Sequence, residues 1–486
     1  MAGTRTNPKN RDLFIGPNAA NAINTILLPA AAGWNAIRHI RFKPTPTVES
    51  SPLANNYGAF DKGRINGPHS CDWELEFAVV KPTAAATEIE QMGTILDNIA
   101  DQSTNAATTV KASPSPTTTS FELTSATSYA AAQMVRVDVT GGADQGAEVR
   151  LLHTLAAAVG TFYPPFSTAP TAADVVNNGL NWTLFDDAGV ANQDSMSMMA
   201  VINTRLVAEG VVGGVVNNIT FRVDAEGFKV SATGMGYMHY HASETNCNGS
   251  VSASATDTDI ELTRPGAFSA FAYYELNANG EYIQNPDYRD EYLDFPNQQW
   301  ENVTRNVNSA GLGTASAADT AKPAVPTASY QTTGGEIPQK ECRVRVYDID
   351  TAQGGLFEYV DFEVSIDRQI VKKSYGGTAS DMDAWTSDGW TISWSMTGDE
   401  TVDNDNDTAG FYGYSLQQRN VVLVLEAGLP SLVAGGSGWA IGMGAAHVLV
   451  HDTSAFEEGS GSRTVTMSGE VRRPTDTTAP IAIAQY

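Results

Sequence analysis

A hairpin pattern occurs twice in this chain and constrains its fold more than any other feature. The first copy lies at 211–234, where alternating apolar and polar residues at 219–223 and 228–232 flank a turn at 224–227. A similar pattern returns at 442–469, with a Gly-rich approach, an alternating run and an acidic, Gly-rich turn. Alternation on both sides of a turn predicts paired strands that bury one face. Two matched hairpins predict a duplicated domain.

The repeat extends upstream of each hairpin, as a strand, a long Gly-containing loop and a strand led by Trp. Phe42 and Trp73 are 31 positions apart (73 − 42), and Phe362 and Trp390 are 28 apart (390 − 362). An order of elements that is kept while identities drift is typical of a repeat. Two unrelated β-domains that share only generic alternation remain an alternative. The expected strands are 38–43, 73–80, 219–223 and 228–232 in the first half, and 359–366, 390–396, 446–451 and 464–468 in the second.

The rest of the chain fits an all-β fold of two tandem sandwich domains. Helical spacing of apolar residues occurs only at 84–100, which predicts one short helix. The first half carries surplus length with further short strands, which we interpret as a small inserted β subdomain. A stretch rich in Ala, Thr, Ser and Pro has the composition of a linker. The expected divisions are a first domain at 1–245 with its insertion at about 101–200, a connecting segment at 246–355 with the linker at 310–335, and a second domain at 356–486.

The charge balance excludes a common class of function. The 486 residues include 29 basic and 55 acidic ones, a net charge of −26. Proteins that bind nucleic acid neutralise phosphates with Lys and Arg, so this chain is a poor candidate for one. The N-terminal residues lack the apolar run of a secretory signal, and the most apolar stretch, 24–33, is too short to cross a bilayer. We expect a soluble protein made in the cytoplasm, without a membrane partner.

Groups that could carry chemistry are few. The acidic run 403–407 starts like a calcium loop, but Thr408 and Tyr414 stand where that loop needs Gly and Glu. His239 and His241 share one strand face, a spacing found in metal-binding sheets, yet no third ligand stands at a diagnostic spacing. The cysteines, at positions 71, 247 and 342, form no metal-binding or disulfide pattern. We expect no enzyme activity, no metal and no cofactor.

The segment 210–234, "GVVGGVVNNITFRVDAEGFKVSATG", resembles the closing hairpin of the tail tube proteins of long-tailed bacteriophages. It has a Gly-rich approach, Val-Asn-Asn before an apolar strand, a turn, and a second strand that ends in Ser-x-x-Gly. The region from "SFELTSA" through "MVRVDVTGG" to "TFYPPFSTAP" is similar to an insertion common in that family. The resemblance covers most of 38–242 and, more faintly, 356–473.

The resemblance implies a structural protein of the virion tail, made in the cytoplasm of a bacterial host. Tube subunits of this family join their inner sheets into rings, and the rings stack into a tube through which DNA passes. Because this chain carries two domains, three copies are implied in each pseudo-hexameric ring. The implied partners are other copies of the chain and the tail terminator, baseplate and tape-measure proteins. An acidic lumen wall repels DNA rather than binding it.

Two other functions remain open at the level of sequence. One is another virion component of the neck, baseplate or capsid decoration. The other is a secreted or surface β-sandwich that binds or hydrolyses carbohydrate, whose paired carboxylates can be close in space without a sequence motif.

The expected contact between stacked rings lies in the long loops between the first and second matched strands, 44–70 and 367–388. Such long connections are usually functional or disordered. They combine aromatic residues with basic residues that run against the acidic trend of the chain. The candidate contact residues are Tyr57, Phe60, Lys62, Arg64, Lys372, Lys373, Tyr375 and Trp385.

Overall fold

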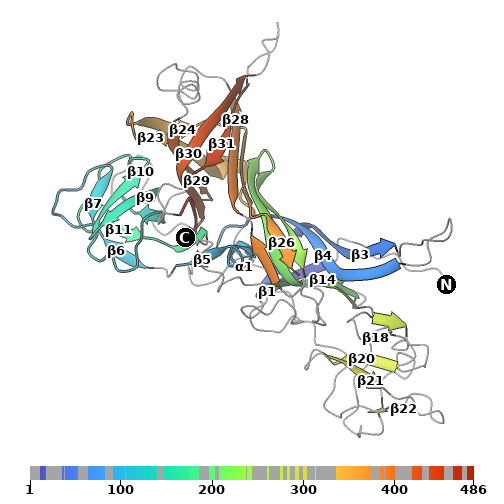
Figure 1. Cartoon of the computed structure of the whole chain (residues 1–486). Coiled ribbons are helices and arrows are strands. Elements are labelled where there is room, and N and C mark those ends of the chain that lie inside the picture. The colour runs from blue at the N-terminus through green and yellow to red at the C-terminus, as the bar shows by residue number, and fades with distance from the viewer. Residues whose placement is uncertain are drawn as a thin grey trace.

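A computed structural model gives the architecture of the chain, and antiparallel strands dominate it (Figure 1). It describes residues 11–17, 35–37, 39–52, 64–82, 91–103, 106–139, 147–184, 196–202, 207–236, 238–242, 260–261, 274–276, 282–284, 290–294, 299–303, 312–313, 335–373, 384–387, 389–399, 419–428, 437–453, 464–472 and 479–486. The prediction of an all-β fold is confirmed.

The first half forms a four-stranded sheet around the predicted hairpin. Strands β14 (Val207–Asp224) and β15 (Gly227–Gly236) form that hairpin across the predicted turn. Strand β15 also pairs with β4 (Arg64–Ala78), and β4 pairs with β3 (His39–Pro52). The spatial order is therefore β3–β4–β15–β14, and the strands expected here are confirmed.

The second half repeats this order with its own strands. Strand β25 (Asp361–Asp367) pairs with β28 (Thr391–Asp399), and β28 pairs with β31 (Thr464–Val471). Strand β31 in turn pairs with β30 (Trp439–Thr453). The order β25–β28–β31–β30 matches that of the first half, position by position.

The registers correct one residue correspondence that the sequence predicts. Gly234 lies opposite Trp73 in the first half, and Gly469 lies opposite Trp394 in the second. Trp73 and Trp394 are both buried. The counterpart of Trp73 is therefore Trp394, and the expected match with Trp390 is wrong. The two tryptophans of the second half are four positions apart, so they share one face of the strand pattern, and alternation alone does not separate them.

The matched Phe residues, in contrast, occupy corresponding places. Phe42 lies opposite Leu75, two positions beyond the buried Trp of β4, and Phe362 lies opposite Met396, two positions beyond the buried Trp of β28. The two long strands also share an irregularity. The ladder between β14 and β15 shifts after Val216, and the ladder between β30 and β31 shifts after the corresponding Val448.

A second sheet in each half is built on the N-terminal part of the long strand. In the first half β2 pairs with β1, β1 with β13 and β13 with β14; in the second half β24 pairs with β23, β23 with β29 and β29 with β30. Strands β16 and β32 continue the opposite edges of β14 and β30. The bounds are β1 (Arg11–Pro17), β2 (Asn35–Ile37), β13 (Met196–Ile202), β16 (Met238–Ala242), β23 (Cys342–Asp348), β24 (Gln353–Phe357), β29 (Asn420–Ala427) and β32 (Ile481–Gln485).

This pairing moves the boundary of the second half. Strands β23 and β24 fall within the expected connecting segment 246–355, yet they pair into the sheet of the second half. They correspond to β1 and β2, so the second set of strands starts at Cys342 rather than at 356. Before them comes a short 3-10 helix, Gln339–Glu341. Earlier in the same segment the described strands form small two-stranded ladders; they are β17 (Ile260–Glu261), β18 (Tyr274–Leu276), β19 (Tyr282–Gln284), β20 (Asp290–Asp294), β21 (Gln299–Val303) and β22 (Leu312–Gly313). Most of the expected linker 310–335 lies outside the described residues.

The insertion in the first half is a six-stranded sheet of its own, and it is narrower than the expected 101–200. Strand β13 belongs to the first half, whereas β12 (Leu180–Leu184) and β5 (Ala100–Gln102) extend the second sheet of the other half through β32. The strands of the inserted subdomain are β6 (Ala107–Thr109), β7 (Ser120–Glu122), β8 (Met134–Val137), β9 (Glu148–Ala156), β10 (Val159–Tyr163) and β11 (Val175–Asn177).

The expected helix is present as α1 (Gln91–Leu96), with Met92, Ile95 and Leu96 buried. These side chains belong to one hydrophobic core cluster that contains residues of both halves, including Phe221 and Phe362. In Figure 1 the inserted subdomain lies at the left, and the paired strands β3 and β4 extend to the right.

Candidate functional site: the polar face of a continuous sheet

The two halves are joined by direct strand pairing, which makes one sheet of two. Strand β14 pairs along its outer edge with β25, from Asn218 opposite Asp367 to Val223 opposite Phe362. The sheet therefore runs without interruption as β3–β4–β15–β14–β25–β28–β31–β30. We call the β14–β25 pairing the internal seam.

One face of the internal seam is fully apolar. Ile219, Phe221 and Val223 of β14 are buried, as are Phe362 and Val364 of β25. These side chains belong to the shared core cluster. Burial of large apolar side chains contributes roughly 1.5–3 kcal/mol for each one. Hydrophobic packing therefore holds the two halves at a fixed relative position.

The other face of the seam carries polar contacts between the halves. Arg222 of β14 forms an ion pair with Asp361 of β25, with Nη2 and Oδ2 2.7 Å apart. The Asp361 carboxylate, as hydrogen-bond partner and negative charge, raises the pKa of Arg222. Nearby, the hydroxyl of Ser365 lies 3.1 Å from Nδ2 of Asn218 and 3.1 Å from the hydroxyl of Thr220. The internal seam thus has one buried apolar face and one polar face.

The polar face continues over all the strands of the sheet. Along β4, β15, β25, β28 and β31, buried apolar residues alternate with half-buried or exposed polar ones. Ser and Thr are frequent among the half-buried or exposed positions of β28 and β31, and carboxylates are frequent on β4 and β25. Among the described side chains of this face, the acidic residues are Asp72, Glu74, Glu76, Asp224, Asp361, Glu363, Asp367 and Glu470, and the basic ones are Arg41, Lys43, Arg222 and Lys229. Acidic side chains outnumber basic ones, so the face is a hydroxyl-rich, net negative surface.

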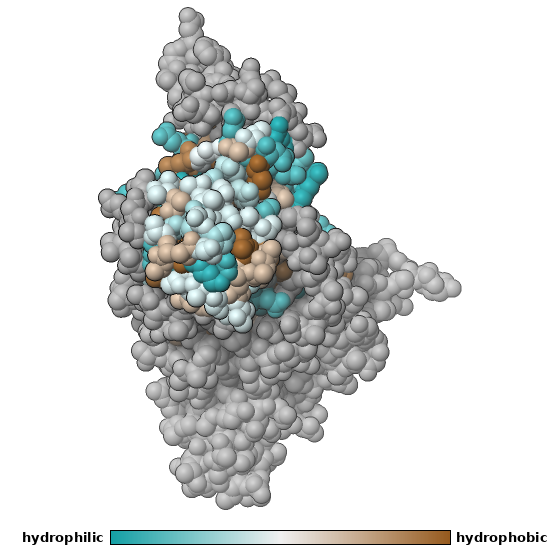
Figure 2. All heavy atoms as spheres, turned by 90° about the vertical axis from the view of Figure 1, so that its left-hand side faces the viewer, coloured by the Kyte–Doolittle hydropathy of each residue, from teal (hydrophilic) through white to brown (hydrophobic). Residues whose placement is uncertain are grey.

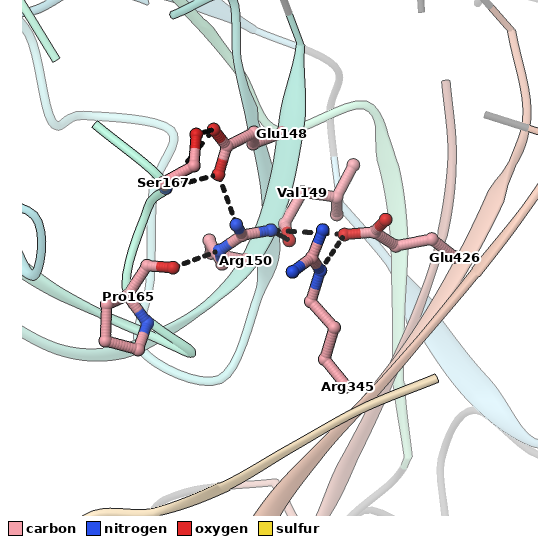
Figure 3. A network of polar contacts seen from close by, with 7 residues as sticks. All are labelled: Glu148, Val149, Arg150, Pro165, Ser167, Arg345 and Glu426. Carbon is pink, nitrogen blue, oxygen red and sulfur yellow. Dashed lines mark hydrogen bonds and ion pairs between the residues drawn. The ribbon is translucent and has the colours of Figure 1, made fainter. Parts of the chain in front are cut away.

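A buried ionic cluster attaches the inserted subdomain to the second half (Figure 3). Arg150 of β9 forms ion pairs with Glu148 of the same strand and with Glu426 of β29, and all three side chains are almost fully buried. Arg345 of β23 lies 3.4 Å from the same Glu426 carboxylate. Ser167 donates its backbone N–H to Glu148. No motif in the sequence indicates this cluster, because Arg150, Arg345 and Glu426 are far apart along the chain.

Apolar and aromatic contacts surround the cluster. Tyr163 of the subdomain stacks on Tyr347 of β23, with ring centroids 5.4 Å apart. Met134 and Leu151 pack with Val422 and Val424 of β29 in a second core cluster. The subdomain is therefore docked on the half that does not encode it. Figure 2 shows its outer face, which is mainly of intermediate hydropathy with scattered strongly hydrophobic or hydrophilic residues.

The expected ring-contact loops are in large part strands, which corrects their description as loops. In the first loop, 44–52 and 64–70 pair as the outer part of β3 and β4, up to Pro52 opposite Arg64. In the second, β26 (Ile370–Lys373) pairs with β27 (Ala384–Ser387). Both halves therefore carry a hairpin arm at the same place in their strand order. The reason is that the alternation needed for pairing is weak in these Gly- and Pro-containing segments, so the sequence pattern does not reveal them.

Only some of the candidate contact residues lie in the described parts of these arms. Arg64 is the first residue of β4, Lys372 and Lys373 lie on β26, and Trp385 lies opposite Lys372 on β27. Tyr57, Phe60, Lys62 and Tyr375 lie outside the described residues. The predicted contact between rings stays a prediction.

The other candidates for chemistry are an acidic run, a pair of histidines and the cysteines. The acidic run 403–407 lies outside the described residues, and His239 and His241 lie on β16 opposite Val211 and Glu209. In the described part of the chain, no group of three or more His, Cys, Asp or Glu residues could hold a metal ion. Cys71 and Cys342 are buried and form no disulfide in the described structure. Burial, with a smaller effect of Glu341, raises the pKa of Cys342 to about 12, so it stays protonated at neutral pH.

Comparison with known proteins finds no protein family that matches the chain and no curated protein that matches it. Among the described residues, no helix has the length and apolar character needed to cross a membrane.

Proposed function

We propose that this chain is a structural subunit of a phage tail tube, in which three copies close a ring of six half-chains and the rings stack around a lumen for DNA. The observation that carries the proposal is the internal seam. It joins two sheets of the same strand order edge to edge, and their polar faces form one surface.

The edges left at the two ends of the sheet support closure into a ring. Strand β3 at one end corresponds to β25, and β30 at the other end corresponds to β14. One end of the sheet therefore carries the counterpart of β25 and the other end the counterpart of β14, and these are the two strands that pair in the internal seam. The same strand pairing between two chains is a heterologous, head-to-tail contact. Such contacts close into a ring when the rotation between neighbouring chains allows it. Closure also covers the exposed strand edges.

The polar face suits the wall of a DNA channel. Its carboxylates outnumber its basic residues and repel phosphates, and its Ser and Thr hydroxyls leave it wettable. We expect no measurable binding of double-stranded DNA at low salt. Changing Asp72, Glu74 and Glu76 together to Lys should produce salt-dependent binding, measured by fluorescence anisotropy. The triple change Asp101→Lys, Glu336→Lys and Asp350→Lys, at exposed positions away from this face, adds the same charge, serves as the matched control and should not.

Electron microscopy of the purified protein tests the proposal directly. We expect rings with sixfold appearance and rods of stacked rings, and a mass of three chains for a single ring in native mass spectrometry. Dispersed monomers at all concentrations, or rings of six chains, would contradict it. Monomers that instead bind a glycan array would favour the carbohydrate-binding alternative.

A further inference from the structure

The internal seam provides a template for contact between separate chains. Among the described residues, β3 pairs only with β4, and residues 450–453 of β30 pair only with β31. These two edges occupy the places that β25 and β14 occupy in the seam. The register of the seam can therefore be transferred to them residue by residue.

Resting on the proposed function, we propose that β30 of one chain pairs with β3 of a second copy in the register of the internal seam. Thr220 lies opposite Ser365 in that seam. The shift after Val448 corresponds to the shift after Val216, so Asp452 takes the place of Thr220. The match of Phe42 with Phe362 places Thr45 where Ser365 stands. The partner of Asp452 is therefore Thr45 of the neighbouring chain.

The charge of the β3 edge is reversed relative to that of β25, its counterpart in the internal seam. On the polar face, β25 brings Asp361 and Glu363 to meet Arg222 of β14. The corresponding positions of β3 are Arg41 and Lys43, both exposed. An arginine or lysine opposite Arg222 is repulsive, so β3 does not substitute for β25 in the internal seam. In the proposed register, position 452, an Asp in the sequence, is the diagonal neighbour of Lys43.

Two prolines make the seam between chains weaker than the internal seam. Pro44 and Pro46 lack the backbone N–H, and within a ladder such residues are tolerated only where the nitrogen faces away from the paired neighbour. Since β3 stays paired with β4 through both prolines, their nitrogens face the outer edge. Val364 and Ile366 occupy the same places in β25. Arg368 donates its backbone N–H to Asn217 of β14, and N–H groups two positions apart in a strand face the same edge, so those of Val364 and Ile366 face β14 as well. The contact between chains therefore lacks two donors that the internal seam has.

The prolines explain how the free edge is controlled before assembly. An exposed strand edge invites unregulated pairing, and proline is one of the devices that blunt it. The internal seam forms within each chain on folding, whereas the seam between chains, which the prolines weaken, forms only at high chain concentration. Assembly thus remains reversible until stacking of rings adds further contacts.

Cysteine pairing tests the register. Thr220 and Ser365 form a non-hydrogen-bonded pair, because the residues on either side of them exchange the backbone hydrogen bonds between the two strands. In an antiparallel ladder, Cα atoms approach most closely in pairs of this type. In Thr45→Cys/Asp452→Cys, we expect disulfides between chains on mild oxidation, seen as multimers on non-reducing gels. Thr45→Cys/His451→Cys is the matched control, because a shift of one residue moves the second thiol to the other face. The single variants and the wild-type chain show the background from the three native cysteines.

Absence of the 45–452 disulfide in assembled rings, or equal yield in the control pair, would overturn the register. Rings and rods without this disulfide would leave the tube function standing and reject the seam. The disulfide without any ring or rod would support the seam and reject the tube. A cross-linked series that continues beyond three chains would reject the ring number alone.

Restoring the missing donors tests the role of the prolines. Pro44→Val/Pro46→Ile copies the side chains of Val364 and Ile366. With circular dichroism to confirm folding, we expect the concentration at half assembly to fall roughly tenfold in light scattering, since each restored hydrogen bond contributes modestly. An unchanged or higher concentration at half assembly would overturn the proposal that these prolines weaken the seam.

Discussion

Arg150 in the inserted subdomain and Glu426 in the second half form a buried ion pair, with Nη1 and Oε1 3.1 Å apart although 276 positions separate them in the chain. The pair spans the junction between the subdomain and β29. It shows that a segment encoded within the first half is part of the structure of the second. With β12 paired to β32, it ties the two halves together in addition to the internal seam.

Removal of Arg150 should therefore destabilise the whole chain. Arg150→Met leaves Glu148 and Glu426 buried without their main partner, and loss of one member of a buried ion pair typically costs about 3–5 kcal/mol. The free energy of unfolding from urea denaturation measures the effect. Lys111→Met removes a partner of Glu122 in a more exposed pair and is expected to cost about 0–1 kcal/mol. Equal losses in both variants would contradict a structural role for the buried cluster.

The two matched glycines should not tolerate a side chain. A Cβ on Gly234 would lie 1.9 Å from the carbonyl oxygen of Val215, and one on Gly469 would lie 1.7 Å from that of His447. The backbone must shift in either case, so each Gly→Ala change should cost roughly 1–3 kcal/mol by thermal or urea unfolding. Gly355→Ala is the control, since no atom lies within 4 Å of its added Cβ. Wild-type stability in Gly234→Ala would refute the close approach of the strands.

Stability should fall on acidification in a way that depends on His447. Burial, with a smaller effect of Arg472, lowers the pKa of this His below its usual 6.5, and neither ring nitrogen has a hydrogen-bond partner in the described structure. The unfolded chain then takes up a proton near pH 6.5 while the folded chain does not. The contribution of neutral His447 is thus fully present above pH 6.5 and is lost as the pH falls towards the folded-state pKa. Unfolding measured at pH 7.5 and pH 5.5 should show a smaller difference in His447→Gln than in the wild type; the same difference in both would exclude His447 as a source.

The arm of the first half should be needed for tubes but not for rings. Replacing 56–63 by a short Gly-Ser turn leaves the paired parts of β3 and β4 intact. We expect a folded protein that forms single rings, and no long rods, in negative-stain images. Normal polymerisation of this variant would show that the arm does not make the contact between rings.

The charge of the second arm gives an independent test of the same contact. Lys372 and Lys373 lie on β26, in a chain of net charge −26. Their change to Glu should shorten rods or abolish them, because the arms then repel the acidic surface of the next ring. Rod length by electron microscopy at low and high salt is the measurement. Rods of wild-type length at low salt would argue against electrostatic contact through this arm.

Local patterns in the sequence are sufficient to predict the class of fold and several strands. A period of two places side chains on alternate faces, so 219–223 and 228–232 can be recognised as a hairpin, and Phe42 and Phe362 as members of corresponding strands. The same alternation does not distinguish Trp390 from Trp394. That choice depends on register, which is visible only where Gly469 lies opposite Trp394.

Sequence patterns alone predict three features of the candidate functional surface: alternating strands, an acidic charge balance and two matched hairpins. How these features combine depends on contacts that exist only in the folded chain. The pairing of β14 with β25, the inclusion of β23 in the second half and the docking of Arg150 on Glu426 all join segments distant in the chain. Propensity and alternation act over a few residues, whereas these contacts form because buried faces and buried charges must find partners in the folded chain. The prolines of β3 show the difference, since Pro44 and Pro46 only limit strand pairing in general until the structure places their nitrogens on an open edge.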